Sequence, residues 1–227
     1  MAAATAPAVR GVLFDLDGTL IDSAPDLAGA ANRLRADHGM APLPLDLLRP
    51  MVGSGARGMV GVAFGVAPGQ PQFESLRDAF LAHYEAGLLQ QTAPFAGVDA
   101  MLCALEAAGI PWGIVTNKAT RFTAPIVAGL GLAQRAAVVV CGDTTPQAKP
   151  HPEPLLHAAR TMGLAPEDMA YVGDDLRDAQ AAQAAGMVMA VATWGYLGQG
   201  EPVHDWGADV LLDTPEQLLA WLRLRGV

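Results

Sequence analysis

Apolar residues in this chain alternate between short continuous runs and longer runs with helical spacing. The first run, residues 10–17, contains Val12, Leu13 and Phe14 and stops at Gly18, which predicts a buried strand. Further strands are predicted at residues 112–116, 137–141, 169–173, 187–192 and 209–212. Helical spacing predicts helices between them, at residues 98–108, 122–130, 152–162 and 176–185, with a last helix opening at residues 214–215.

Residues 23–92 interrupt this alternation directly after the first strand. Ser23 and Asp26 have capping-box spacing, so a helix is predicted to begin there and to stop at Gly39. Further helices are predicted at residues 45–51, 57–64 and 73–89. Strands that alternate with helices imply a parallel sheet covered on both faces. We therefore expect an α/β fold, with a Rossmann-like core of residues 1–22 and 93–227 and an inserted α-helical cap domain of residues 23–92.

The composition and net charge of the chain limit the kinds of molecule that it is expected to bind. Of 227 residues, 52% are hydrophobic, which is enough for a sizeable core, and 23 acidic against 14 basic residues give a net charge of −9. So acidic a chain is a poor partner for nucleic acid or an anionic membrane. With only Cys103 and Cys141, no signal-peptide pattern in residues 1–10 and no apolar run of ~20 residues, we expect a cytoplasmic protein.

The clearest candidate chemistry follows the first strand, at Asp15 and Asp17. Side chains alternate along a strand, so both carboxylates are predicted to point the same way. Adjacent carboxylates repel each other unless a cation or a proton intervenes. They come at the carboxyl end of a strand, where open α/β sheets bind ligands, and Gly18 allows a sharp turn there. An aspartate pair that only caps the strand end would show the same local pattern.

Three more polar groups follow predicted strands or precede helices. Singly, each is typical of a helix cap or a solvated side chain. Their occurrence in order, each near the carboxyl end of a strand, favours one shared site at that edge of the sheet. They are Thr116 with Asn117 and Lys118, Lys149, and Asp174 with Asp175 and, one helical turn later, Asp178.

This ordered set resembles the motifs of the haloacid dehalogenase superfamily. The resemblance rests on Asp15-Leu-Asp17-Gly-Thr19, then Thr116, Lys149 and Gly-Asp-Asp at 173–175, and it covers essentially the whole chain. The helical insert after the first motif resembles the branch with an α-helical cap, and within that branch the phosphoglycolate phosphatases. Such an insert is placed to close over a site and exclude water, and we expect that closure here.

The resemblance implies a phosphatase with an aspartyl-phosphate intermediate. Asp15 would attack phosphorus, and Asp17 would protonate the leaving oxygen and then activate water. Thr116, through its hydroxyl, and Asn117, through its main-chain N–H, would hold phosphoryl oxygens, and Lys149 would neutralise charge. Family members that cleave carbon–halogen bonds lack the second aspartate, so its presence favours phosphate chemistry.

The resemblance also implies a Mg²⁺ site. Its ligands would be Asp15, the backbone carbonyl of Asp17, and Asp174, since Mg²⁺ prefers hard oxygen ligands. Asp175 and Asp178 are expected to orient the metal's surroundings or to cap the helix. Together these aspartates place five of the 23 acidic residues at one site, where Mg²⁺, a lysine and helix N-termini would let an acidic protein bind an anion.

The substrate is less closely specified. Residues 53–59 resemble the substrate-facing cap segment of phosphoglycolate phosphatases, where Arg57 is expected either to pair with a substrate carboxylate or to lie on the surface. Residues 112–118, 121–122, 194–196 and 206–209 resemble the N-acetylmuramic acid 6-phosphate phosphatases, whose substrate also carries a carboxylate. The expected function is hydrolysis of a small phosphate monoester, phosphoglycolate first, with the amino-sugar phosphate as the alternative and a phosphomutase less favoured.

Two other classes of protein use similar residues. A signalling receiver domain places its acidic pair at the first strand and its acceptor aspartate later, but the second acidic group at residues 173–175 and the long insert argue against that class. A catalytically inactive scaffold would not need the complete motif set. We expect a monomer or homodimer whose partner is a small phosphorylated metabolite.

Overall fold

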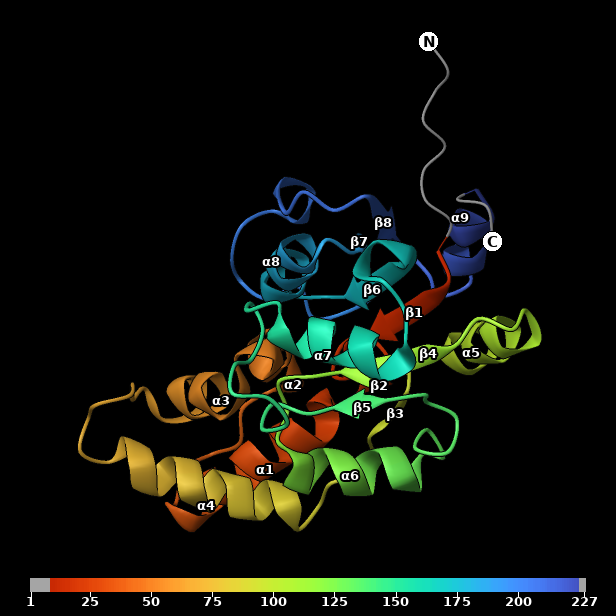
Figure 1. Ribbon diagram of the computed structural model, residues 1–227. Helices are drawn as coiled ribbons and strands as arrows, with labels where there is room; N and C mark the ends of the chain where they lie inside the picture. Colours follow the sequence, from red (N-terminus) through yellow and green to blue (C-terminus); the bar gives the residue numbers. More distant parts are fainter. Residues whose placement is uncertain (1–8, 225–227) are drawn as a thin grey trace.

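The computed structural model describes residues 9–224, and the sequence-based expectations for residues 1–8 and 225–227 lie outside this range. Within it, six strands form one parallel sheet in the order β5-β4-β1-β6-β7-β8 (Figure 1). These strands are β1 (Gly11–Phe14), β4 (Trp112–Val115), β5 (Val139–Val140), β6 (Met169–Gly173), β7 (Val188–Ala192) and β8 (Val210–Leu212). The α/β fold with a central parallel sheet is therefore confirmed.

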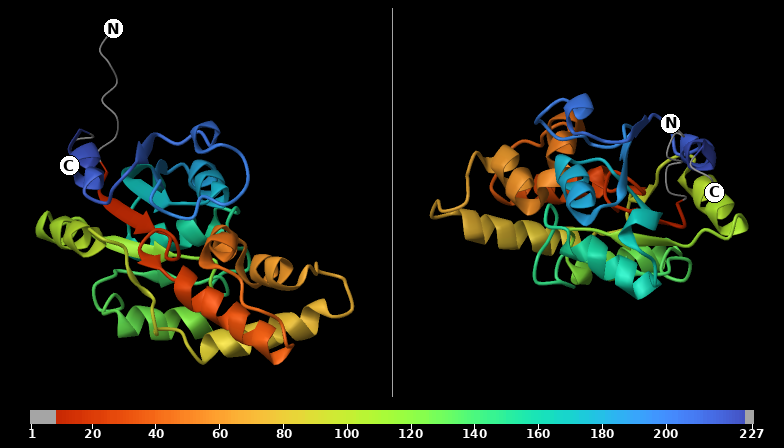
Figure 2. Two further views of the ribbon diagram at one scale, coloured as in Figure 1. Left: turned by 180° about the vertical axis from the view of Figure 1, so that it is seen from behind. Right: turned by 45° about the horizontal axis from the view of Figure 1, so that its top comes forward.

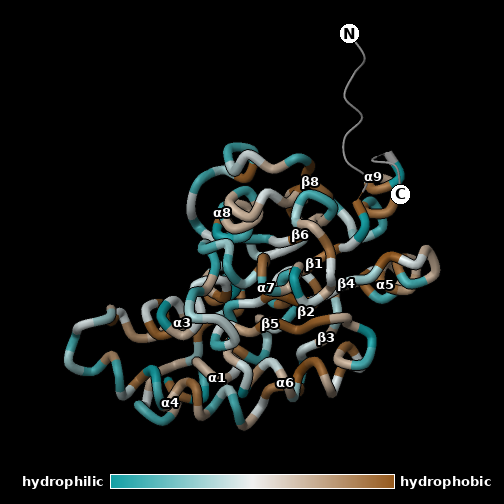
Figure 3. Tube along the Cα trace, in the orientation of Figure 1, coloured by the Kyte–Doolittle hydropathy of each residue, from teal (hydrophilic) through white to brown (hydrophobic). Residues whose placement is uncertain are grey.

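Helices cover both faces of the sheet because successive strand residues point to opposite sides. Val12 and Phe14 of β1 belong to one apolar cluster, whereas Leu13 between them belongs to the other. The first cluster includes side chains of α5 (Val98–Ala107), α6 (Thr120–Gly129) and α9 (Gln217–Leu224). The second includes α7 (Glu153–Met162) and α8 (Leu176–Ala185). The tube coloured by hydropathy shows mixed polar and apolar positions along α4 and α6, as expected of helices with one buried side (Figure 3).

The helical insertion lies between two short strands that the sequence pattern did not reveal. β2 (Ile21–Asp22) and β3 (Ala93–Pro94) pair antiparallel where the chain leaves and rejoins the core. The inserted elements are α1 (Ala24–Asp37), α2 (Leu45–Leu48), the 3₁₀ helix η1 (Arg49–Ser54), α3 (Gly55–Phe64) and α4 (Phe73–Glu85). Figure 2 shows these orange and gold helices gathered beside one end of the sheet. That residues 23–92 act as a separate cap domain stays a prediction.

The capping box predicted at the start of α1 is wrong. The Ser23 side chain makes no capping bond and donates instead to Asp17 Oδ1 at 2.5 Å. Asp26 accepts hydrogen bonds from the main-chain N–H groups of Gln91 and Thr92 at the far end of the insertion. Both side chains satisfy partners distant in sequence, so local spacing alone gave the wrong assignment.

Several boundaries also differ from the sequence pattern. The first strand ends at Phe14 and Asp17 lies in the turn after it, so strand alternation does not orient both carboxylates. β5 is reduced to Val139–Val140, and the last helix begins at Gln217, not at residues 214–215. The remaining connections contain the short 3₁₀ helices η2 (Pro166–Asp168) and η3 (Val203–Asp205).

Candidate active site

Asp15 lies directly beyond β1 and is paired with a buried lysine. Its main-chain N–H donates to Val172 O at 2.9 Å, which continues the β1–β6 pairing by one residue. The Lys149 ammonium, whose side chain is 3% exposed, lies 2.9 Å from Asp15 Oδ1. Burial raises the pKa of Asp15 to about 7, opposed by Lys149 and reinforced by Asp178. A carboxylate in this position is held at the carboxyl edge of the sheet with its charge only partly compensated.

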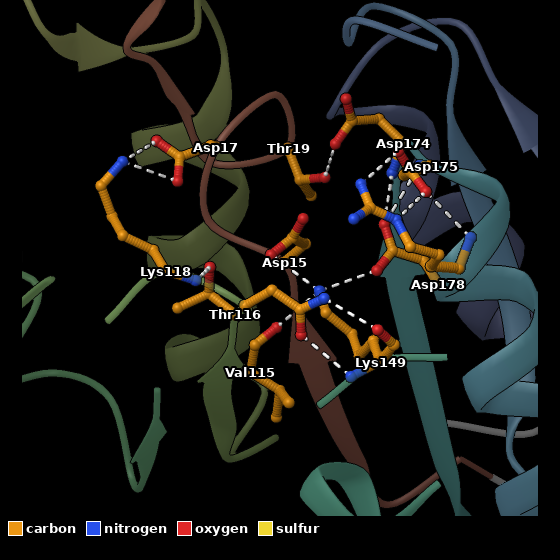
Figure 4. A network of polar contacts seen from close by, with 12 residues as sticks. Asp15, Asp17, Thr19, Val115, Thr116, Lys118, Lys149, Asp174, Asp175 and Asp178 are labelled. Carbon is orange, nitrogen blue, oxygen red and sulfur yellow. Dashed lines mark hydrogen bonds and ion pairs between the residues drawn. The ribbon is translucent and has the colours of Figure 1, made fainter. Parts of the chain in front are cut away.

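Lys149 is surrounded by oxygen atoms. Besides Asp15, its ammonium contacts Asp178 Oδ1 at 2.7 Å, Tyr171 Oη at 2.7 Å and Val115 O at 3.0 Å (Figure 4). Burial alone would lower the pKa of Lys149, but the adjacent carboxylates of Asp15 and Asp178 outweigh it, and the net shift is upward. The ammonium therefore stays charged and fixed in place.

Three carboxylates converge beside this lysine. Oxygen atoms of Asp15, Asp174 and Asp178 all lie within 4.8 Å of one another. Burial raises the pKa of Asp174 well above its usual range, and the neighbouring charges of Asp15 and Asp178 raise it further. The buried Asp15 Oδ1 receives no hydrogen bond of acceptable geometry from the described residues, although the Lys149 ammonium is close by. An excess of buried negative charge, all of it on hard oxygen atoms, fits a small divalent cation.

Asp174 is oriented by two donors and by two close glycines. Its carboxylate accepts hydrogen bonds from Thr19 Oγ1 and from the Tyr196 N–H, each at 2.8 Å. A Cβ on Gly18, where φ is +87°, would lie 2.1 Å from Asp174 Oδ2. A Cβ on Gly195 would lie 2.3 Å from Asp174 Cβ. Only glycine fits at either position, because the backbone approaches this carboxylate too closely for any side chain.

Asp17 lines the same cavity as Asp15 but has different partners. Lys118 Nζ lies 2.7 Å from Oδ1 and 2.9 Å from Oδ2 of Asp17, and Ser23 donates to Oδ1. Figure 4 shows Asp17 turned toward Lys118, away from the cluster around Asp15. Each of the two aspartates of the first motif is thus held by its own lysine.

Thr116 and Asn117 follow β4 and stand beside Asp15. Thr116 is buried, and its hydroxyl accepts from the Lys118 N–H at 3.2 Å. The Asn117 side chain bonds both the N–H and the carbonyl of Lys149, each at 2.9 Å, and so fixes the lysine loop to the end of β4. The main-chain N–H of Asn117 has no hydrogen-bond partner within residues 9–224, which leaves it available to an anion.

The N-terminus of α8 connects the core to the insertion. Asp175 and Asp178 form a capping box there. Capping this helix was one of the two roles expected for them. Arg177 binds Asp175 through two nitrogens, each 2.8 Å from a carboxylate oxygen, and also donates to Gly53 O in the insertion. Although burial acts in the other direction, Arg177 lowers the pKa of Asp175. Arg177 is therefore one polar tie between the core and η1.

A cavity of about 340 Å³ joins these groups and lies in the usual size range of ligand pockets. The predicted residues line it together with Phe80, Leu81, Tyr84 and Phe122 and with residues 53–56 of the insertion. Arg57 is not among its lining residues and instead lines a separate pocket with Met51 and Val62. The predicted residues that the structure brings together are Asp15, Asp17, Thr116, Asn117, Lys149, Asp174, Asp175 and Asp178.

Two basic residues of this cavity, Lys118 and Arg177, had no role assigned from the sequence. Lys118 is part of the segment 116–118 that follows β4, and Arg177 lies between Asp175 and Asp178. The sequence could have pointed to both residues, because each lies within a segment that already contained candidate site residues. The sequence pattern did not reveal their partners. Lys118 binds Asp17 of the first motif, and Arg177 binds Gly53 of the insertion.

The fold and this site define a haloacid dehalogenase-like hydrolase. The model of that family, described as haloacid dehalogenase-like hydrolase, matches residues 12–192, and the chain belongs to this family. It is 49% identical over 210 residues to a phosphoglycolate phosphatase of Xanthomonas campestris pv. campestris, covering 92% of this chain and 94% of that one. It is 42% identical over 212 residues to the N-acetylmuramic acid 6-phosphate phosphatase of Pseudomonas aeruginosa, covering 93% of each. The protein is a phosphatase.

Solved structures agree with this assignment. The crystal structure of a predicted phosphoglycolate phosphatase from Haemophilus somnus superposes with a TM-score of 0.83 at 28% identity, over 94% of this chain and 97% of that chain. In the part of the chain that the structure describes, no helix is both long and apolar enough to cross a membrane.

Proposed function

We propose that the protein hydrolyses a small phosphate monoester through an aspartyl-phosphate formed on Asp15. The observation that carries the proposal is that Asp15 lines the cavity, with its buried oxygen beside Lys149 and the second carboxylate, Asp17, in the same cavity. The Lys149 ammonium, 2.9 Å from Asp15 Oδ1, favours the ionised carboxylate that attacks phosphorus and offsets the charge that accumulates.

The other residues divide the work of phosphoryl transfer. Asp17 protonates the leaving oxygen and then takes a proton from the attacking water. The Thr116 hydroxyl and the free N–H of Asn117 hold phosphoryl oxygens, and Lys149 neutralises negative charge on them and on Asp15. Two observations support these roles. All these groups line one cavity, and the Asn117 side chain links the end of β4 directly to the Lys149 backbone.

Mg²⁺ is the proposed cofactor. Asp15, the backbone carbonyl of Asp17, and Asp174 would hold it, and Asp178, whose carboxylate oxygen lies within 4.8 Å of theirs, would orient its surroundings. When bound, the ion supplies Lewis-acid charge neutralisation at the phosphoryl group. The convergence of three buried carboxylates around one ammonium supports this assignment.

Phosphoglycolate is the proposed substrate, and N-acetylmuramic acid 6-phosphate is the alternative. Relatives of both kinds match nearly the whole chain, at 49% and 42% identity for the two named above. A phosphomutase reaction, which would use the same aspartates, is a third and less favoured possibility. We propose a cytoplasmic enzyme, monomeric or homodimeric, that acts on a small metabolite and not on nucleic acid.

We further propose that residues 23–92 form a cap that closes over the cavity. Residues of α4 and residues 53–56 line the cavity, and Arg177 ties η1 to α8. Closure would exclude water from the transferring phosphoryl group. Structures with and without a bound phosphate analogue test this directly, and an identical open cap in both would refute it.

The experiment for the proposed function is phosphate release from a panel of esters, with and without chelator. Phosphoglycolate, N-acetylmuramic acid 6-phosphate and simple sugar phosphates form the panel, and sustained net phosphate release separates hydrolysis from mutase activity. We expect chelator-sensitive release that is fastest with phosphoglycolate. Chelator-insensitive release would refute the metal site, and failure on every ester would refute the proposal.

A further inference from the structure

Lys118 is the basic residue of the cavity with the fewest fixed partners. Lys149 is surrounded by four oxygen atoms, and Arg177 is occupied by Asp175 and Gly53 O. The Lys118 ammonium, by contrast, has only the Asp17 carboxylate as an ionic partner within residues 9–224. It is also only 9% exposed, so its charge is poorly screened by water.

The surroundings of Lys118 on its other side are aromatic. Its ammonium lies 4.9 Å from the centroid of the Tyr84 ring, and that ring packs on Phe122 with centroids 5.5 Å apart. The Tyr84 hydroxyl is buried, and no described residue forms a hydrogen bond of acceptable geometry with it, although the Lys118 ammonium is close enough to interact with it. Burial raises the pKa of Tyr84 to about 12, so the hydroxyl is a neutral donor. A buried, unpaired hydroxyl costs stability unless a ligand provides its partner.

The ion pair between Lys118 and Asp17 also conflicts with the role proposed for Asp17. Both oxygens of Asp17 accept hydrogen bonds from Lys118, and Oδ1 accepts another from Ser23. Each carboxylate oxygen has two acceptor positions, so proton exchange between Asp17 and the leaving oxygen of a substrate competes with these bonds and is favoured by the release of Lys118. A ligand that carries a second anionic group can provide that release by taking Lys118 as its own partner.

We infer that Lys118 determines substrate specificity by exchanging its ion pair with Asp17 for the carboxylate of the substrate, to which Tyr84 donates a second hydrogen bond. The inference rests on the proposed phosphatase function. Lys118 touches Asp17, which acts at the leaving oxygen, so the recognised carboxylate must lie close to that oxygen. The preferred ligand is an ester whose carboxylate stands on the carbon that bears the phosphoester oxygen, as in phosphoglycolate, and not on a substituent across a sugar ring.

The test compares phosphoglycolate with its carboxamide analogue, which has nearly the same shape and lacks the charge. For each enzyme the measured quantity is the ratio of kcat/KM for the acid to kcat/KM for the amide. In Lys118→Met we expect this ratio to fall by about 30-fold, the range of a hydrogen bond to a charged group. Tyr84→Phe removes only the unpaired hydroxyl and should lower the ratio by about fivefold without loss of thermal stability.

The matched control is Arg10→Met, which removes a positive charge from a side chain that is 65% exposed and does not line the cavity. It should leave the ratio unchanged. A general loss of activity in Lys118→Met lowers both kcat/KM values and cancels in the ratio, so it cannot imitate the predicted effect. Arg57→Met completes the set, because Arg57 is the other candidate partner for the carboxylate.

An unchanged ratio in Lys118→Met would overturn the inference, and so would a fall in Arg57→Met that Lys118→Met does not show. If Lys118→Met does not fold, an unchanged ratio in Tyr84→Phe overturns it instead. Wild-type enzyme that cleaves neither ester would refute the proposed function itself. Wild-type enzyme that cleaves both, with ratios insensitive to Lys118 and Tyr84, would refute only the inference.

Discussion

The Lys149 ammonium lies 2.9 Å from Oδ1 of Asp15 at the carboxyl edge of the sheet. Because the lysine also contacts Asp178, it is the central cation of a buried acidic cluster, and its removal leaves both carboxylates without compensation. Removing one partner of a buried ion pair costs about 3–5 kcal/mol. Catalysis loses its fixed positive charge at the same time.

Lys149→Met is therefore expected to lower the free energy of unfolding of the metal-free protein by about 3 kcal/mol. The turnover number should fall by at least about 100-fold. Mg²⁺ should restore part of the stability and little of the activity, because the ion replaces the charge but not its position. Urea denaturation with and without Mg²⁺ measures this, and unchanged stability in the metal-free variant would contradict it.

The raised pKa of Asp15 predicts how the stability of the metal-free protein depends on pH. Its value is about 7 in the folded chain, against about 3.9 for an unfolded aspartate, so between these pH values the folded chain retains a proton that the unfolded chain has lost. The resulting contribution to the free energy of unfolding is complete below pH ~4 and is lost as pH rises through ~7.

Asp15→Asn should reduce this decline, since the amide does not titrate. Denaturation in EDTA across the same pH interval measures the slope, with Asp46→Asn on the exposed surface as the control. Equal slopes in wild type and Asp15→Asn would show that Asp15 does not hold a proton in the folded chain.

Metal binding should stabilise the protein by mass action and should depend on Asp174. Mg²⁺ is expected to raise Tm in a concentration-dependent way, and EDTA to abolish activity until Mg²⁺ is restored. Asp174→Asn should weaken Mg²⁺ binding by about tenfold or more. Asp175→Ala, which removes the cap of α8 but is outside the carboxylate cluster, should lose about 1 kcal/mol of stability and change Mg²⁺ affinity far less. Equal affinities in the two variants would refute the assignment of Asp174.

Gly18 and Gly39 allow a controlled test of whether the backbone at Gly18 must lie close to Asp174. Both have positive φ, +87° and +68°, but a Cβ on Gly18 would collide with the Asp174 carboxylate, whereas a Cβ on Gly39 meets no atom within 4 Å. Gly18→Ala should therefore displace Asp174 and reduce kcat/KM by about 100-fold or more. Gly39→Ala should cost only about 1 kcal/mol of backbone strain and leave kcat/KM unchanged. Similar kinetics for both variants would contradict the account of Gly18.

The polar residues singled out in the sequence come together because a parallel sheet brings the carboxyl ends of its strands to one edge. Asp15 after β1, Thr116 after β4 and Asp174 after β6 are distant in sequence and share one cavity for that reason. The order of motifs along the chain was thus sufficient to predict which side chains meet.

Local spacing in the sequence did not predict features that depend on residues distant in the chain. Ser23 has the spacing of a helix cap, yet its hydroxyl binds Asp17, and no local pattern reveals that choice. β2 and β3 have two residues each, too few to show a strand period, and they form because the two ends of the insertion meet. Arg57 lies in a separate pocket because the packing of α3 on its neighbours, which spacing does not determine, sets its direction.

The most direct test of the central claim is to stop the reaction with phosphoglycolate and Mg²⁺ by rapid acid quench and to map phosphorylated peptides by mass spectrometry. The account predicts a hydroxylamine-sensitive phosphoryl group on Asp15 that appears during turnover and is absent from an Asp15→Asn variant without activity. Turnover with no phosphoryl group on Asp15, or turnover that persists in Asp15→Asn, would contradict it.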